Sequence, residues 1–131
     1  LLTLSGAIEM EISSMDMNEQ KEFLNEYGLE ESGLNKMIRY AYQTLQLETF
    51  FTAGPKEVRA WSIRKGSTAP KGAGVIHSDF ERGFIKAEVY TINDLIKYKN
   101  EIEIKNAGKL RQEGKEYIIN DGDIIFFKFN V

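Results

Sequence analysis

Apolar side chains recur at helical spacing between residues 34 and 45. They occupy positions i, i+3, i+4, i+7, i+8 and i+11 of one continuous stripe: Leu34, Met37, Ile38, Ala41, Tyr42 and Leu45. This stripe predicts an amphipathic helix that packs against another surface, with Ser32 as its N-cap. A shorter helix is predicted before it, because Asp16 and Glu19 form a capping-box pattern and Gly28 follows as a stop signal.

From Glu48 onward the pattern changes to alternation with period two, which is typical of β-strands. The segments 49–52 and 58–63 flank a turn at Gly54-Pro55, and together they predict a hairpin. The last segment, 124–131, is apolar on both faces. A strand that is apolar on both faces is covered on both, so we expect it at the centre of the sheet.

Between the hairpin and the last strand, the pattern predicts one short helix and a third strand. Thr68 is placed to cap the helix, with Pro70 in its first turn. The side chains expected to point inward from the helix region are Ala73, Ile76 and Phe80. The strand that follows is expected to bury one face and leave the other solvated, and its inward residues are Ile85, Ala87 and Val89.

The remaining segments are shorter. Residues 93–98 predict a helical turn, 99–108 a polar connection, 110–119 one or two short strands, and 120–123 a tight turn. The order from residue 48 is strand, strand, helix, strand, strand, strand, which predicts an α+β roll. At the other end, Leu1–Leu4 is typical of a buried parallel strand whose sheet lies in an upstream part of a longer protein.

Composition and charge narrow the class of protein. The chain has no cysteine, no apolar run long enough to cross a bilayer and no secretory signal, which fits a reducing compartment. Residues 1–53 carry 9 acidic and 3 basic side chains, whereas residues 54–131 carry 11 acidic and 14 basic ones. This charge step suggests two units with different neighbours. The basic half is compatible with a polyanion partner or with an ordinary solvated surface.

Catalytic signatures are missing from the sequence. No glycine-rich phosphate loop is present, and Lys65-Gly66-Ser67-Thr68 lacks the upstream glycine spacing of one. Structural roles are favoured over catalysis or metal binding for three further groups, namely His77 at a helix end, Asp79 with Glu81 in capping and local ion pairs, and Asp121 with Asp123 in a tight turn rather than a calcium loop.

Two features have a functional interpretation. Arg59, Trp61 and Ile63 share one face of a strand, where an arginine beside an aromatic ring can stack on a nucleobase; alternatively, Trp61 fills the core. The second feature is a set of basic residues. They form a binding surface if the fold brings them together, and an ordinary solvated surface if it does not. Its members are Arg59, Arg64, Lys65, Lys71, Arg82, Lys86, Arg111 and Lys115, with Lys128 nearby in the last strand.

Two long motifs and two short ones resemble the C-terminus of the YchF and Obg-like ATPases, a family related to translation-factor P-loop GTPases. They are the segments 51–61, 74–84, 121–123 and 129–131. The resemblance covers essentially the whole chain. It implies that residues 48–131 form a TGS domain, which has the ubiquitin-like β-grasp fold, and that residues 1–47 are the end of a G domain.

The resemblance also implies a division of function. Ser5, Gly6 and Ala7 would match the last nucleotide motif, which helps surround the base. The P-loop, the switch regions and the site for ATP or GTP with Mg²⁺ are expected upstream, so the fragment itself is expected to hydrolyse no nucleotide and to hold no cofactor or metal. The parent is expected to be a cytoplasmic ATPase that associates with ribosomes.

Two roles for residues 48–131 stay open at this point. They form either a docking module for the ribosome or RNA, or a lid that completes and regulates the ATPase site without binding RNA. In both cases the G domain upstream is a partner. The apolar side chains of Leu1–Leu4 and Leu34–Leu45 are expected to pack against that domain. Without it, we expect these segments to self-associate, to swap strands or to fold back on residues 48–131.

Overall fold

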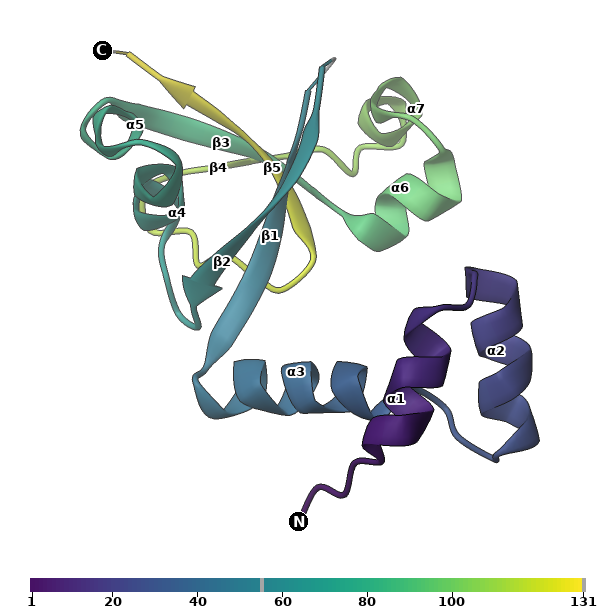
Figure 1. Cartoon of the computed structure of the whole chain (residues 1–131). Helices are drawn as coiled ribbons and strands as arrows, with labels where there is room; N and C mark the ends of the chain where they lie inside the picture. The colour runs from purple at the N-terminus through teal and green to yellow at the C-terminus, as the bar shows by residue number, and fades with distance from the viewer. Residues whose placement is uncertain (55, 131) are drawn as a thin grey trace. The chain divides into compact units, whose positions relative to one another are not determined.

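The computed structural model describes residues 1–54 and 56–130. The chain divides into two compact units, Leu1–Leu45 and Gln46–Val131. The boundary lies two residues before the position that the sequence suggested. In colour order along Figure 1, the first unit contains three helices and the second contains a sheet with four further helices. The fold is therefore α+β, as the sequence predicted.

The first unit consists of α1 (Gly6–Ser13), α2 (Met17–Glu26) and α3 (Gly33–Thr44). The predicted capping box is confirmed at the start of α2, where the amide of Glu19 donates to Asp16 at 3.0 Å and the Glu19 carboxylate accepts from the Asp16 amide at 2.9 Å. Gly28 follows α2 with a φ of +66°, a conformation that glycine adopts without strain. Ser32 caps α3 by accepting from the amide of Asn35 at 3.1 Å.

The strand predicted at Leu1–Leu4 was expected to pair with a sheet outside these residues, and it stays a prediction; here residues 1–5 have no regular structure. A strand needs a neighbouring chain to satisfy its backbone groups, and no described segment pairs with it. The stripe of α3 is also largely uncovered. Between two fifths and two thirds of each of its large aliphatic side chains is exposed, at Leu34, Met37, Ile38 and Leu45.

The second unit is built on a mixed five-stranded sheet. Its strands are β1 (Leu47–Ala53), β2 (Val58–Arg64), β3 (Phe84–Thr91), β4 (Arg111–Glu113) and β5 (Asp123–Phe129). They lie in the order β2-β1-β5-β3-β4. The predicted hairpin is confirmed, because β1 and β2 are antiparallel with Phe50 opposite Trp61. The central place predicted for the last strand is also confirmed, since β5 runs parallel to β1 and antiparallel to β3.

Four helices cover the two faces of the sheet: α4 (Ala69–Ile76), α5 (Ser78–Arg82), α6 (Ile92–Tyr98) and α7 (Glu101–Asn106). The helix predicted after Thr68 is confirmed as α4, with Pro70 in its first turn. The predicted polar connection 99–108 is wrong because it contains α7. Asn100 caps this helix by accepting from the amide of Glu103 at 2.9 Å, and Ile104 is completely buried.

The core lies on both sides of the sheet because successive strand residues point to opposite faces. Phe50, Ala73 and Phe127 belong to the cluster under α4, whereas Ile104 and Ile124 belong to the cluster under α6 and α7. Figure 1 shows the two helix pairs on either side of the strands.

The third strand deviates from its predicted pattern at its start. A register shift between Phe84 and Lys86 leaves Ile85 more than half exposed, and Phe84 is buried instead. The solvated face predicted for this strand is also interrupted, because Tyr90 is buried under the second helix pair. Ala87 and Val89 are fully buried, as the alternation predicted.

Candidate functional site

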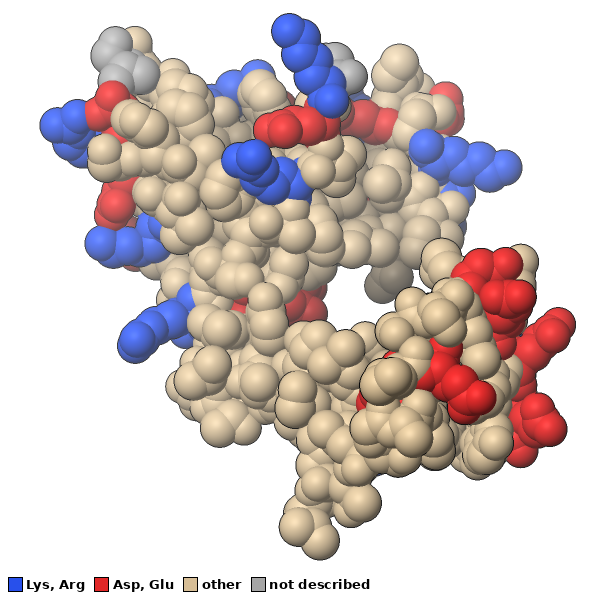
Figure 2. Space-filling view, viewed as in Figure 1, with Lys and Arg blue, Asp and Glu red and all other residues tan. Residues whose placement is uncertain are grey.

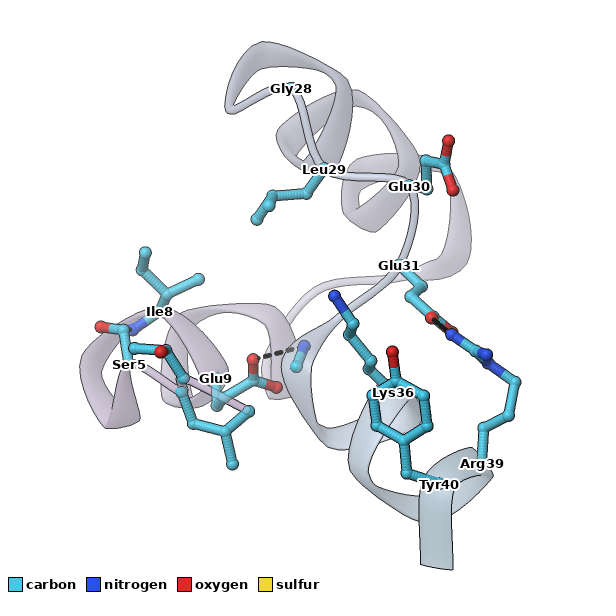
Figure 3. Close-up of a pocket in the computed structure, with 13 residues that line it drawn as sticks. Ser5, Ile8, Glu9, Gly28, Leu29, Glu30, Glu31, Lys36, Arg39 and Tyr40 are labelled. Carbon is cyan, nitrogen blue, oxygen red and sulfur yellow. Dashed lines mark hydrogen bonds and ion pairs between the residues drawn. The ribbon is translucent and has the colours of Figure 1, made fainter. Parts of the chain in front are cut away.

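A pocket of about 630 Å³ opens in the first unit (Figure 3). The start of α1, the loop between α2 and α3, and the first two turns of α3 surround it. Side chains of three kinds line it: apolar Ile8 and Leu29 from opposite walls, polar Ser5 and Tyr40, and a set of charged residues, namely Glu9, Glu30, Glu31, Lys36 and Arg39.

Ser5 reaches this pocket as the N-cap of α1, and its hydroxyl accepts from the amide of Ile8 at 3.5 Å. Gly6 and Ala7 form the first turn of the same helix. A methyl group placed on Gly6 would find no atom within 4 Å, so the backbone there is open to a ligand. Of the three residues predicted to surround a base, Ser5 alone lines the pocket itself.

Glu9 fixes the opposite wall, and no sequence pattern pointed to it. Its carboxylate accepts from the amide of Gly33 at 2.7 Å and from that of Leu34 at 3.2 Å. Both amides lie in the first turn of α3, where backbone N–H groups have no partner within the helix and a negative charge is stabilised. Glu9 therefore ties the start of α3 to α1, as Figure 3 shows.

The cations of the pocket differ in availability. Arg39 forms an ion pair with Glu31, which holds the pKa of the guanidinium above its usual value through a hydrogen bond and through charge. The Arg39 guanidinium also lies 5.1 Å from the centre of the Tyr40 ring. Lys36 makes no ion pair with a described residue, and its amino group points toward the pocket in Figure 3. This wall offers an ammonium and an aromatic hydroxyl to a polar ligand.

In the second unit, three of the predicted basic residues are engaged in ion pairs. Lys71 contacts Glu81 at 2.8 Å, Arg82 pairs with Asp79, and Arg111 contacts Glu113 at 3.1 Å. The hydrogen bond from Arg82 is the main reason why the pKa of Asp79 lies below its usual value. The charges of these three residues are thus partly neutralised before any partner arrives.

The other five do not form one patch. Arg59 and Arg64 lie on opposite faces of β2, and Lys65 lies in the turn that follows it. Lys86 lies on the α6–α7 face, where it donates to Gln112 at 3.0 Å, and Lys115 is exposed between β4 and β5. Figure 2 shows blue side chains spread around the visible face of the second unit. The structure does not bring the eight predicted residues together.

The polar groups given structural interpretations have those roles here. His77 caps α5 by accepting from the amide of Asp79 at 3.1 Å. Asp121 accepts from the amide of Thr49 at 2.7 Å, and the buried Asp123 accepts from the Tyr117 hydroxyl at 2.7 Å. Among residues 1–54 and 56–130, no group of three or more potential ligands is arranged to hold a metal. None of the helices in these ranges is long and apolar enough to span a lipid bilayer.

Comparison with known proteins identifies the family. Residues 47–130 match YchF-GTPase_C, which is described as a protein of unknown function (DUF933). The chain belongs to this family. The match covers the whole sheet of the second unit with both of its helix pairs.

Relatives extend the similarity into the first unit. The chain is 56% identical over its full length to the ribosome-binding ATPase YchF of Pasteurella multocida, and 52% identical over 99% of its length to Obg-like ATPase 1 of Gallus gallus. It spans 36% and 33% of those proteins. The structure of the Schizosaccharomyces pombe YchF GTPase matches 95% of this chain and 33% of its own, with a TM-score of 0.83 and 41% identity. These findings confirm the resemblance to YchF and Obg-like ATPases.

Proposed function

We propose that this YchF-family chain combines one wall of a nucleotide pocket with a module that docks on the ribosome, and that it hydrolyses no nucleotide by itself. The observation that carries the proposal is the 56% identity, over all 131 residues, to a protein named as a ribosome-binding ATPase. The chain spans about a third of that relative, so the activity of a whole ATPase requires further parts.

The second unit supplies the docking module in this proposal. We assign it to the TGS type of ubiquitin-like β-grasp domain. An N-terminal hairpin, a central last strand parallel to β1 and a helix packed over both support the assignment. This unit carries 14 basic and 12 acidic side chains, whereas residues 1–45 carry 3 and 8. The more basic unit is the one suited to contact a phosphate backbone.

The first unit supplies the pocket wall. Ser5 lines the pocket together with Lys36 and Tyr40, and the backbone at the neighbouring Gly6 is open; we assign this pocket to the base of ATP or GTP. In this proposal, a G domain outside residues 1–131 holds the phosphates and the metal. The exposed apolar stripe of α3 is the surface available to pack against that domain.

Ribosome co-sedimentation tests the docking role. We expect the longer protein to pellet with ribosomes at low salt, to pellet less as salt rises, and to lose most of its association when residues 46–131 are removed. The salt dependence follows from release of counterions by phosphate contacts. Unchanged association after the deletion would overturn the docking role and favour the lid.

Nucleotide assays test the enzymatic part of the proposal separately. The 131-residue chain should show no ATP or GTP turnover and at most feeble binding by calorimetry, because one wall of a pocket buries too little of a ligand. Steady hydrolysis by this chain, lost when Ser5 and Lys36 are replaced, would show that the phosphate-gripping machinery is within it.

A further inference from the structure

The face of the sheet that carries α4 and α5 is only partly covered, and a groove remains beside the hairpin. It encloses about 470 Å³ and lies over β1, between β2 and β5. The side chains that matter here come from β1, β2 and β5 and from α4 and α5: Thr52, Arg59, Trp61, Ile76, Phe80 and Phe129.

Aromatic rings border this groove on two sides. On one side, Phe80 and Phe129 stack with their centroids 3.7 Å apart. On the other, the half-buried Trp61 is held in orientation by the hydrogen bond from its indole nitrogen to the Thr52 hydroxyl, at 2.9 Å. The two borders belong to strands that β1 separates, and Phe129 lies farther along the sheet than Trp61, because Trp61 pairs with Phe50 whereas β5 meets β1 at Phe51 and Ile124. Trp61, at one border of the groove, is a side chain on which a flat ring can stack.

Arg59 adds a charge to the aromatic border. Its guanidinium lies 5.1 Å from the centre of the Trp61 ring, and the side chain is exposed. No carboxylate pairs with it among the described residues, in contrast to Arg82 and Arg111. Glu57 also lines the groove and contributes the opposite charge. The site therefore offers an available, planar cation next to an apolar slot with one carboxylate at its edge.

We propose that this groove binds one base of a single-stranded RNA, with an adjoining phosphate on Arg59. The proposal rests on the docking function proposed above and narrows it to one site. Stacking on aromatic rings accepts any base and needs few polar contacts, which matches the apolar lining. An apolar side chain from a protein partner would also fill the slot, but it would leave the Arg59 charge without a counter-charge.

Trp61 provides the readout, because it is the chain's only tryptophan. Short oligoadenylate and oligouridylate are titrated into the 131-residue chain at low salt while the tryptophan emission is recorded. We expect saturable quenching by both. An abasic oligonucleotide of equal length keeps the phosphates but has no bases, and it should leave the emission nearly unchanged. Equal quenching by the abasic strand, or none by any strand, would overturn the proposal.

Two matched variants separate the groove from general charge. Arg59→Gln and Arg64→Gln each remove one positive charge from β2, but from opposite faces. Arg59→Gln should weaken oligonucleotide binding by about fivefold or more, and Arg64→Gln by less than about twofold. Glu57→Gln should tighten binding, because it removes a negative charge from the groove. Equal effects of the two arginine variants would contradict a site in the groove.

Ribosome co-sedimentation of the longer protein distinguishes this site from the docking function as a whole. If Arg59→Gln reduces association and the oligonucleotides quench Trp61, both proposals stand. If association persists in the wild type but no oligonucleotide quenches, docking stands and the base site is wrong. If Arg59→Gln abolishes association without any quenching by oligonucleotides, the groove binds a protein and the RNA proposal fails.

Discussion

The two units differ most in how much of each is buried. In the second unit, ten residues form one buried cluster under α4, and three more form a cluster under α6 and α7. In the first unit, Ile12 and Ser32 are the buried residues among those described. Burial of apolar surface is the main stabilising contribution to a small domain. The second unit therefore has its own core, whereas the first has apolar surface still to be covered.

Polar contacts show the same contrast. Tyr117, Asn120 and Arg111 surround the buried carboxylate of Asp123, so a polar network adds to the packing of the second unit. In the first unit the comparable link is the carboxylate of Glu9 on the amides of α3, and it is partly exposed. A network in a buried setting contributes more than the same groups in water, because its donors and acceptors have no alternative partners.

Dividing the chain between Leu45 and Gln46 should have the largest effect on this comparison. Residues 46–131 should keep a single cooperative unfolding transition. Residues 1–45 should lose most of their helicity when dilute, because short helices are marginal without packing. At high concentration they should associate through the α3 stripe. Circular dichroism and sedimentation equilibrium over a range of concentrations check both halves. A dilute, monomeric, fully helical 1–45 peptide would refute the contrast.

The substitution Phe50→Ala should nearly unfold the second unit. Phe50 is fully buried and meets Phe127 edge to face, so its removal leaves a cavity at the centre of the sheet. We expect a loss of about 3–5 kcal/mol in the free energy of unfolding, measured in urea. Phe126→Ala is the matched control, because Phe126 is half exposed on the same sheet and should cost less than about 1 kcal/mol.

Asp123→Ala should have the next largest effect. The change leaves the Tyr117 hydroxyl and the Asn120 amide without their acceptor and removes a counter-charge from Arg111. We expect a loss of about 2–3 kcal/mol in the free energy of unfolding. Asp121→Ala, which removes one exposed hydrogen bond to Thr49, should cost about 1 kcal/mol. Equal losses from the two changes would show that burial of Asp123 contributes nothing.

Local patterns predicted the elements whose signals lie within a few residues. The capping box at Asp16 and Glu19 and the cap at Ser32 are confirmed, and so are the hairpin and the central strand. The incorrect predictions concern segments whose structure depends on contacts with residues far away in the sequence. Ile104 is the one buried residue of α7, so this segment has no apolar stripe from which a helix could be predicted. The strand at residues 1–4 is not one of these errors, because its expected partner sheet lies outside the residues described and the prediction stays open.

The candidate site was less predictable than the fold. Arg59 and Trp61 were correctly placed on one face, because they are two residues apart on a strand. Whether eight basic residues converge depends on which faces and loops they occupy and on their ion-pair partners. These properties depend on tertiary contacts, which the spacing of residues in the sequence does not indicate. The contact between Glu9 and Gly33 joins residues 24 positions apart, so no pattern of spacing within one helix could have indicated it.

Glu9→Ala tests the main polar link of the first unit and should have a smaller effect. It exposes the two amides at the start of α3 and removes a favourable charge from that helix end. We expect a loss of about 1 kcal/mol, seen as reduced helicity at low concentration. Glu11→Ala is the control, because Glu11 lies exposed on the same helix. The assignment fails if both variants lose helicity equally.

The pH dependence of unfolding should give the smallest effect and concerns Tyr117 of the second unit. Burial raises the pKa of its phenol above the ordinary value of 10.0, and the hydrogen bond to Asp123 raises it further. The unfolded chain thus releases this proton at lower pH than the folded unit does. The contribution is fully present below about pH 10 and is lost as the pH rises through the higher folded value.

Urea unfolding of residues 46–131 between pH 8 and 11 measures this decline. Burial also raises the pKa of Tyr90, so a residual decline is expected when Tyr117 no longer titrates. Tyr117→Phe should therefore give a shallower slope of unfolding free energy against pH, whatever its effect on stability at pH 8. An identical slope for the variant would exclude Tyr117 as the group responsible and leave Tyr90 as the source.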